Sequence, residues 1–383
     1  MNLQAPLIRR TRGMGFADYT ITHRFPQIAA QVKEVVSSEP LHDKIDALVN
    51  AIENGEALQE VDHLAKPSDF WRDYLEGIKS HTWDDLSFFE LEFLFYHSLN
   101  SLTAFFDVGF DVFETVRQRA LMDAMPDFDN EVNTIDWSSL EESIQHLVQR
   151  ATFGNSADYS QFDVTGVAKS NESSLLVDQS DDLVKRLMEQ SINCVELIAD
   201  NAGRELCWDL ALIDGILQAN VQQVVFHVKP WPMFVSDALT SDVKNTIQMM
   251  KAQSPDSVTY SMGQRLSQYI DSGRLDIRSA DDWGEPRHFS QLSTDLVTGL
   301  NKADVVIAKG DLNYRRFIED RLWPEETSVD QAAHNVPFSA FALRVLKSEA
   351  VAGIPLTVHQ HLNLSDPDWR CDGRYAIIQR IGG

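Results

Sequence analysis

Apolar residues in the first part of the chain recur at the spacing of an α-helix. Ile28, Val32 and Val35 lie three or four residues apart, a repeat that places apolar side chains on one face of a helix. Similar spacing continues over residues 25–147, which we expect to be helical. Ser87–Glu90 has the composition of a helix start, and the aromatic run after it is more typical of a hydrophobic core than of a cofactor site.

The helical spacing ends near residue 150. Between Ala151 and Ser180 the chain is rich in Gly, Asn, Ser, Asp and Thr, which is typical of a connecting segment. We therefore predict a boundary here, with a helical N-terminal domain at 1–150 and a second domain at 151–383.

Short β-branched runs alternate with helical stretches after Asp181. This alternation is typical of a mostly parallel sheet covered by helices on both faces. The expected fold class is therefore α/β, with a helical N-terminal domain attached to an α/β/α sandwich. The expected strands are 194–199, 224–228, 274–278, 304–308, 341–346 and 375–379.

The net charge and the cysteine content exclude several kinds of binding partner and structural site. The chain of 383 residues has a formal net charge of −25, which disfavours binding to nucleic acid or to anionic membranes, because both are held chiefly by Lys and Arg. Its three cysteines form no CxxC pair and no even-numbered framework, so neither a zinc site nor a disulfide scaffold is supported. No segment has the length of a signal peptide or a membrane span. We expect a cytoplasmic protein, and the sequence gives no sign of an obligate protein partner.

Polar side chains follow two of the expected strands. Asp200 and Asn201 come directly after the first run, and Asp237 follows the second. The carboxyl ends of parallel strands meet at one edge of a sheet, where α/β proteins bind their ligands. Two carboxylates and an amide oxygen are hard donors that suit Mg²⁺, Mn²⁺ or a similar divalent ion. The alternative is that Asp200 or Asn201 caps the helix that follows.

A third strand end is basic. The segment Lys309–Arg315 combines a glycine suited to a tight turn with Lys and Arg, and therefore suits a small anionic ligand such as a phosphate. Arg344 and Lys347, at the end of a further run, add positive charge. The alternative for each cation is an ordinary surface position.

Several well-known catalytic motifs are missing from the sequence. There is no GxSxG, HExxH or GxGxxG pattern and no DxDxT or DxDxV phosphatase motif, so covalent serine chemistry is not expected. We expect the lone histidines His227 and His288 to be structural, and Asp209 and Asp242 to be solvated carboxylates on helices.

The motifs together resemble those of one family. The specific likeness is in the second half of the chain, at Asp200–Leu206, Phe234–Asp237, Lys309–Arg315, Trp369 and Gly373–Tyr375. A looser likeness in the first half is carried by Phe16–Ile21, Arg24–Ile28 and Phe153–Asp158. Through these segments the chain resembles the damage-control phosphatases of domain-of-unknown-function family 89, subfamily III.

The resemblance implies a Rossmann-like α/β/α domain and a divalent-metal-dependent phosphatase, using Mn, Mg, Co or Ni, that acts on small phosphorylated metabolites. Sugar phosphates such as fructose 1-phosphate or fructose 6-phosphate are the implied substrates. Asp200, Asn201 and Asp237 match the metal ligands and catalytic residues. The implied substrate contacts are Glu205, Lys309, Asp311, Asn313, Arg315, Lys347 and Asn155. The subfamily motif Arg-Thr-x-Lys reads Arg344-Val345-Leu346-Lys347 here, so the threonine hydroxyl is lost.

The resulting hypothesis is metal-assisted hydrolysis. An ion held by the three predicted ligands binds a phosphoryl oxygen and orients a water molecule, while Lys309, Arg315 and Lys347 clamp the remaining oxygens. A direct aspartyl nucleophile is an alternative to the water. Two rival functions are an S-adenosylmethionine-dependent protein carboxyl methyltransferase, an activity also ascribed to this branch, and a non-enzymatic sugar-phosphate sensor.

Overall fold

The computed structural model describes residues 5–58, 63–154, 175–219 and 221–382. Within them lies a seven-stranded sheet with the order β1-β7-β6-β5-β2-β3-β4. The strands are β1 (Leu175–Asp178), β2 (Cys194–Ile198), β3 (Gln223–Val228), β4 (Leu275–Ser279), β5 (Val305–Lys309), β6 (Ala340–Val345) and β7 (Ala376–Ile381).

The sheet is mostly parallel, as expected. Neighbouring strands from β4 to β6 run parallel, and β7 pairs antiparallel with β6. All six expected strands form, with ends within two residues of the expected ones. The seventh, β1, was not expected, because it is a short, partly exposed edge strand without a long β-branched run. The continuous apolar runs are explained by burial: every residue of β5 is buried, as in a sheet covered on both faces.

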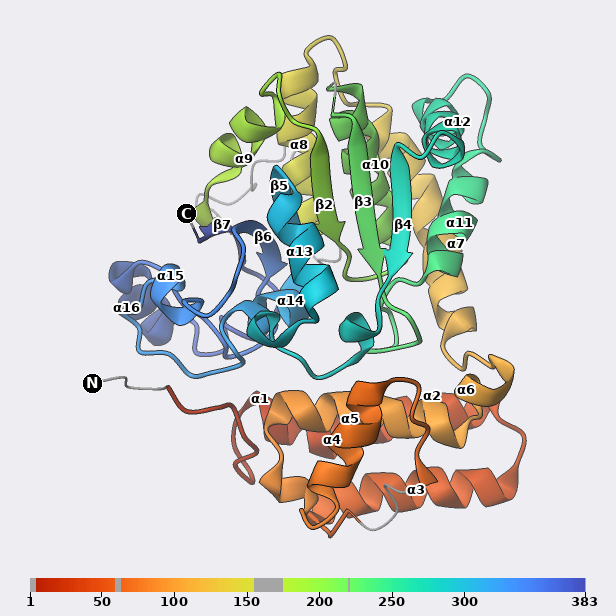
Figure 1. Cartoon of the computed structure of the whole chain (residues 1–383), viewed down its shortest axis with the longest axis vertical. Helices are drawn as coiled ribbons and strands as arrows, with labels where there is room; N and C mark the ends of the chain where they lie inside the picture. Colours follow the sequence, from red (N-terminus) through yellow and green to blue (C-terminus); the bar gives the residue numbers. More distant parts are fainter. Residues whose placement is uncertain (1–4, 59–62, 155–174, 220, 383) are drawn as a thin grey trace.

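Helices cover both faces of the sheet (Figure 1). On one face a core cluster joins the strands to α7 (Glu114–Val132), α8 (Leu140–Phe153), α9 (Ser180–Leu187), α10 (Arg204–Gln218), α11 (Thr240–Met250) and α12 (Val258–Asp271). On the other face a second cluster contains residues of α13 (Thr294–Lys302), α14 (Gly310–Phe317), α15 (Val329–Ala332) and α16 (Leu356–Ser365). The α/β fold class is therefore confirmed.

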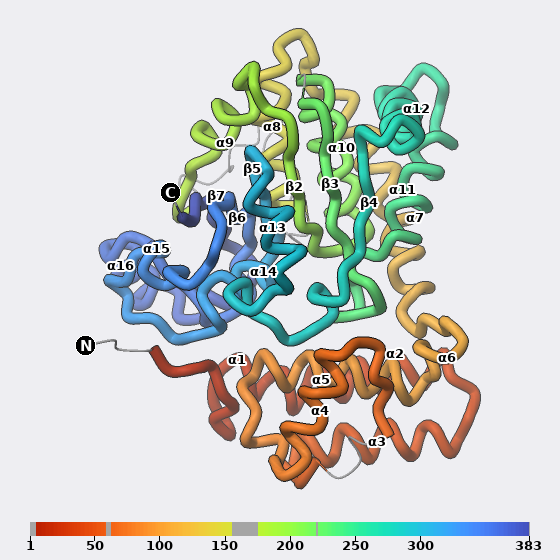
Figure 2. Tube along the Cα trace, in the orientation of Figure 1, coloured from red at the N-terminus to blue at the C-terminus, as the bar shows by residue number. Residues whose placement is uncertain are grey.

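The remaining helices form a separate layer beyond the carboxyl ends of β2, β3 and β4 (Figures 1 and 2). They are α1 (Gly15–Tyr19), a π-helical turn (Thr20–Arg24), α2 (Phe25–Val35), α3 (Glu39–Asn54), α4 (Asp69–Ile78), α5 (Phe88–Leu102) and α6 (Phe105–Val108). Their core includes Trp231 and Met233 from the loop after β3 and Leu312 from α14. This helical layer is therefore packed against the ends of the strands, where the candidate site residues lie.

Helix α5 begins and packs as its sequence predicts. The Ser87 hydroxyl accepts a hydrogen bond from the backbone N–H of Glu90, and the Glu90 carboxylate accepts one from the backbone N–H of Ser87. This reciprocal capping satisfies two donors at the helix start. Phe89, Phe93, Phe95 and Tyr96 of the helix are buried in the core of the helical layer, as expected, while Phe88 packs in the core cluster of α13–α16.

A division of the chain at residue 150 stays a prediction, and the packing favours an earlier boundary. Helices α7 and α8 pack on α10 and belong to the core on the sheet. The Trp208 ring of α10 lies 4.9 Å from the Phe128 ring of α7, and the Arg150 guanidinium of α8 lies 5.4 Å from the same indole. The helical layer that lies apart from the sheet thus ends before α7. In the described parts of the chain, no helix combines the length and hydrophobicity that a membrane span requires.

Replacing Trp208 with Ala tests the importance of this packing. The indole is fully buried, so its removal leaves a cavity between α7, α8 and α10. We expect the free energy of unfolding to fall by about 3–5 kcal/mol, measured by urea denaturation. Leu364→Ala is the control, because Leu364 is 88% exposed and its loss is expected to change stability by less than about 0.5 kcal/mol. Equal effects of the two changes would contradict the packing argument.

Candidate active site

The loops after β2 and β3 are joined by backbone pairing. Asn201 and Asp237 form an isolated antiparallel β-bridge, and the backbone N–H of Ala238 donates to the carbonyl of Asp200 at 2.9 Å. The structure therefore brings Asp200, Asn201 and Asp237 together from two strand ends, as the sequence suggested.

The backbone just before Asp237 is strained. Phe234 and Val235 both have positive φ, at 49° and 65°, in the left-handed region that a β-branched residue such as Val rarely adopts. Such conformations cost about 1–3 kcal/mol each and persist only where the surrounding structure enforces them. They turn the chain so that Asp237 lies beside Asn201.

The third strand end meets the first at Gly310. A Cβ atom at this position would lie 2.0 Å from Oδ2 of Asp200, and the φ of Gly310 is +84°. Only glycine provides both the left-handed backbone and the room for the carboxylate. The start of α14 thus lies directly against Asp200.

Asp237 is buried and Asp200 is partly buried beside it, and their pKa values reflect these positions. Burial raises the pKa of Asp200 well above its ordinary value, and the charges of Glu205 and Asp237 raise it further. Burial raises the pKa of Asp237 to about 6, although the amine of Lys229 opposes the shift. A cation bound between the carboxylates would relieve this desolvation and repulsion.

The donor set fits a divalent ion. Asp200, Asn201 and Asp237 offer hard oxygen donors, and Oδ2 of Asp237 is buried without a hydrogen bond, although it lies 3.3 Å from the Lys229 amine. No group of three or more His, Cys, Asp and Glu side chains suited to a metal ion occurs in the described parts of the chain. The predicted set has only two such residues beside an amide, so the ligand assignment stays a prediction.

Lys309 lies close to the site but its charge is already balanced. Its amine donates to Oε1 of Glu205 at 2.9 Å and to Oδ1 of Asp209 at 2.6 Å, and the side chain is fully buried. Burial lowers the pKa of Lys309, but the two carboxylates more than offset this and hold it above its ordinary value. A contact between Lys309 and a substrate phosphate stays a prediction, and the geometry favours an internal role.

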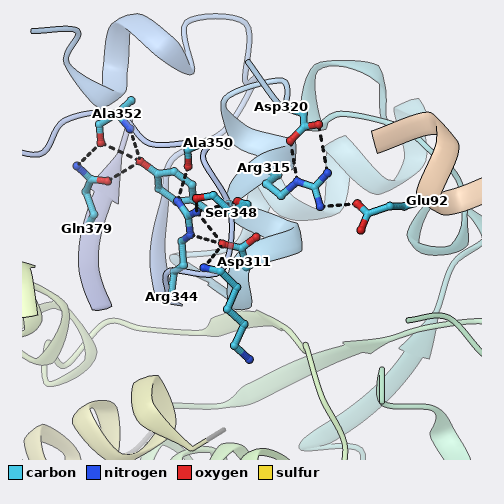
Figure 3. A network of polar contacts seen from close by, with 11 residues as sticks. Glu92, Asp311, Arg315, Asp320, Arg344, Ser348, Ala350, Ala352 and Gln379 are labelled. Carbon is cyan, nitrogen blue, oxygen red and sulfur yellow. Dashed lines mark hydrogen bonds and ion pairs between the residues drawn. The ribbon is translucent and has the colours of Figure 1, made fainter. Parts of the chain in front are cut away.

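Arg315 is also engaged within the protein (Figure 3). Its guanidinium donates to both oxygens of Asp320, at 2.6 and 3.2 Å, and to Glu92 of the helical layer at 2.7 Å. The predicted role of Arg315 as a phosphate clamp likewise stays untested. In this structure it joins α14 to the helical layer.

Asp311 belongs to a second network in Figure 3. Its Oδ1 accepts from the Arg344 guanidinium at 2.8 Å and from the backbone N–H of Lys347 at 3.0 Å. Burial raises the pKa of Asp311, but the Arg344 guanidinium lowers it below its ordinary value. Asp311 and Arg344 therefore fix the backbone of Lys347, and their own charges are paired.

The other predicted substrate contacts have different surroundings. The Asn313 amide donates to the carbonyls of Ala199 and Lys309, at 3.1 and 2.8 Å, and so ties the ends of β2 and β5 together. Its Oδ1 is buried without a hydrogen bond among the residues that the structure describes. Asn155 lies outside the described residues.

The expectation of solvated carboxylates on helices was wrong for Asp209 and Asp242. Asp209 is fully buried because α10 is covered on all sides, and it binds Lys309. Asp242 is buried at the start of α11 and accepts from Arg117 at 2.9 Å.

Lys347 offers an amine that is not already paired. Within the described parts of the chain its Nζ makes no hydrogen bond or ion pair, and its charge lowers the pKa of the nearby Asp200. The residue lines a cavity of about 1240 Å³ between the start of the helical layer and the segments that follow α14, β6 and α16. Arg24 and Phe16 line the same cavity from the helical layer.

Lys229 is a site residue that the sequence interpretation missed. Its amine lies 3.3 Å from Asp237 and donates to the carbonyl of Trp283 at 3.0 Å, and burial lowers its pKa to about 8. Its position in the sequence could have revealed it. Lys229 directly follows the apolar run of β3, and Asp200 lies in a similar place, one alanine after the apolar run of β2.

Comparison with known proteins identifies the family. A model described as the damage-control phosphatase ARMT1-like domain matches residues 20–362, so the chain belongs to this family. Relatives named damage-control phosphatase ARMT1 include the Danio rerio protein, which is 33% identical over 190 residues, covering 48% of this chain and 42% of the relative. The Homo sapiens protein is 28% identical over 275 residues, covering 66% and 62%. The matches thus span about two fifths to three fifths of these relatives.

A solved structure supports the fold. A DUF89 family protein from Pyrococcus horikoshii matches with a TM-score of 0.53 at 15% identity, covering 96% of this chain and 99% of that chain. At this identity the likeness shows the fold alone. The family and fold that the sequence motifs suggested are confirmed.

Replacing Gly310 with Ala tests the contact between α14 and Asp200. The new Cβ atom would clash with the carboxylate. We therefore expect the free energy of unfolding to fall by about 1–3 kcal/mol more than the left-handed backbone of an alanine alone would cost. Gly273→Ala is a matched control, because Gly273 has φ +74° and nothing within 4 Å of the added Cβ; it is expected to cost about 1–2 kcal/mol. The two free energies of unfolding are compared by urea denaturation. If both variants lose the same free energy of unfolding, Asp200 and Gly310 are not in contact.

Proposed function

We propose that this protein is a divalent-metal-dependent phosphatase that hydrolyses phosphomonoesters of small metabolites, with sugar phosphates such as fructose 1-phosphate or fructose 6-phosphate as substrates. The observation that carries the proposal is the convergence of Asp200, Asn201 and Asp237 at one point on the carboxyl edge of the sheet. Membership of the damage-control phosphatase ARMT1-like family supports the reaction class.

The residues have distinct roles in this proposal. Asp200, Asn201 and Asp237 would hold a divalent ion (Mn, Mg, Co or Ni), which supplies charge neutralisation at the phosphoryl group and an activated water. Asp200 or Asp237 would also accept the proton of the water, because both lie where the ion would be held. Attack by one of these carboxylates itself is the alternative.

Lys347 binds the phosphate in this scheme. It is the predicted cationic contact whose amine stays unpaired in the described structure, while Lys309 and Arg315 are held by carboxylates. Ligand cavities typically measure about 300–1,000 Å³. The cavity of about 1240 Å³ beside Lys347 therefore has room for the remainder of a sugar phosphate.

Phosphate release from metal-stripped protein tests the function. We expect Mn²⁺, Mg²⁺, Co²⁺ or Ni²⁺ to restore hydrolysis across a panel of sugar phosphates, nucleotides and p-nitrophenyl phosphate, with the highest rate on a ketose phosphate. Asp237→Asn is expected to lower kcat/KM by about 100- to 1,000-fold, because a ligand and a charge at the reacting centre are lost. The variant's circular dichroism spectrum serves as the control for folding.

Two results would overturn the proposal. Full metal-dependent activity in Asp237→Asn would remove the ligand assignment. No release with any metal would remove the phosphatase itself, and methyl transfer from labelled S-adenosylmethionine or tight sugar-phosphate binding without turnover would then favour the methyltransferase or the sensor.

Replacing Lys347 with Met tests the phosphate contact. A charge-assisted hydrogen bond contributes about 1.5–3 kcal/mol, so we expect kcat/KM for a sugar phosphate to fall by about 10- to 100-fold. Lys244→Met on α11 is the control, since this exposed lysine lies on a helix remote from the cavity. Equal kinetics of both variants would exclude Lys347 from substrate binding.

A further inference from the structure

Glu205 has both carboxylate oxygens engaged inside the protein. Oε1 accepts from the Lys309 amine at 2.9 Å, and Oε2 accepts from the Asn201 side-chain amide at 3.0 Å. The residue is 5% exposed. A direct contact with substrate would need one of these bonds to break, which leaves a buried polar group without a partner.

The hydrogen bond from Asn201 fixes the orientation of that side chain. Its Nδ2 donates to Oδ2 of Asp200 at 2.7 Å and to Oε2 of Glu205 at 3.0 Å. The NH₂ group donates both bonds and the carboxylate oxygens accept them, so the NH₂ group faces Asp200 and Glu205. The amide oxygen is therefore turned the other way, toward the hydroxyl of Ser236 at 2.5 Å and the loop that carries Asp237.

Two further buried residues hold Glu205 in place. Lys309 bonds Glu205 and Asp209 at once, and both Lys309 and Asp209 have no exposed surface. Asp209 lies one helical turn after Glu205 on α10, so the two carboxylates face β5 from the same side of the helix. The four residues form an orienting chain, which runs Asp209, Lys309, Glu205, Asn201.

We propose that Glu205, Lys309 and Asp209 are positioning residues that aim the amide oxygen of Asn201 at the divalent ion. They act through Asn201 and not on the substrate. The proposal rests on the proposed function, because it takes Asn201 to be a ligand. Residues that orient metal ligands commonly change metal affinity by about 10- to 100-fold when replaced.

Glu205→Gln disrupts the chain with little change of shape. Lys309 and Asn201 bind different oxygens of Glu205, and a Gln side chain replaces one of these oxygens with an NH₂ group that cannot accept. Either the buried Lys309 amine faces an NH₂ group, or Asn201 loses the acceptor that holds its orientation. Asp209→Asn loosens the same chain at its far end, where no substrate reaches.

The first measurement is calorimetric titration of Mn²⁺ into metal-stripped protein without substrate. We expect Glu205→Gln and Asp209→Asn each to weaken Mn²⁺ binding by about 10- to 100-fold. The second is phosphate release at saturating Mn²⁺, where KM for the sugar phosphate is expected to stay within about twofold of the wild-type value.

Asp214→Asn is the matched control. Asp214 is a fully buried carboxylate on the same helix, and it accepts from Arg265 at 2.9 and 2.6 Å. Its replacement breaks a buried ion pair of similar kind outside the orienting chain. We expect this variant to lose stability while its affinity for Mn²⁺ stays that of the wild type.

The outcomes separate this inference from the proposed function. If Glu205→Gln binds Mn²⁺ like the wild type and shows a raised KM, Glu205 contacts the substrate and the inference is wrong. If Asp214→Asn weakens Mn²⁺ binding as much as Asp209→Asn, the effect is one of general stability and the inference is again wrong. If the wild type neither binds Mn²⁺ nor releases phosphate, the proposed function itself fails.

Discussion

The buried ion pairs of Lys309 are the interaction on which the rest of the site depends. Lys309 ends β5, while its partners Glu205 and Asp209 lie on α10, which directly follows the loop of Asp200 and Asn201. Buried charges are costly unless they are paired. These ion pairs therefore hold the end of β5 against α10, the helix that follows β2. Under the proposed function, a divalent ion held by Asp200, Asn201 and Asp237 would link this part of the protein to an anionic substrate.

The arginines near this centre are used to stabilise the protein's own architecture. Arg315 joins α14 to Asp320 and Glu92, and Arg344 holds Asp311 together with the carbonyl of Ala350. In a chain with net charge −25, such cations find carboxylates within the protein itself. The basic strand end that suggested an anion site is therefore largely internal. The amine of Lys347, whose backbone N–H is bound by Asp311, stays unpaired among the described residues and is available to a ligand.

The sequence predicted the sheet and the meeting point of the strand ends better than it predicted their side-chain partners. Strands such as β5 are buried on both faces, so their continuous apolar runs are visible in the sequence. Asp209 was misjudged because burial of α10 on all sides depends on α7 and α8, which no local pattern reveals. Lys229 was missed for a related reason: its partners Asp237 and Trp283 come from two different loops. Periodicity reports which face of an element is apolar, whereas pairing of buried charges is decided by tertiary contacts.

The loop after β4 is bound both to the candidate site and to the helical layer. The Trp283 carbonyl accepts from Lys229 and from Arg316, and Arg316 also donates to the carbonyls of Glu285 and Arg287. Glu285 in turn accepts from the Ser68 hydroxyl at the start of α4, at 2.5 Å. This loop is therefore fixed both to Lys229, the partner of Asp237, and to the helical layer. The cavity beside Lys347 lies between the start of the helical layer and the segments that follow α14, β6 and α16. Lys347 is the residue of the proposed site that lines this cavity. The proposed function therefore requires the substrate to approach Asp200 and Asp237 past this amine.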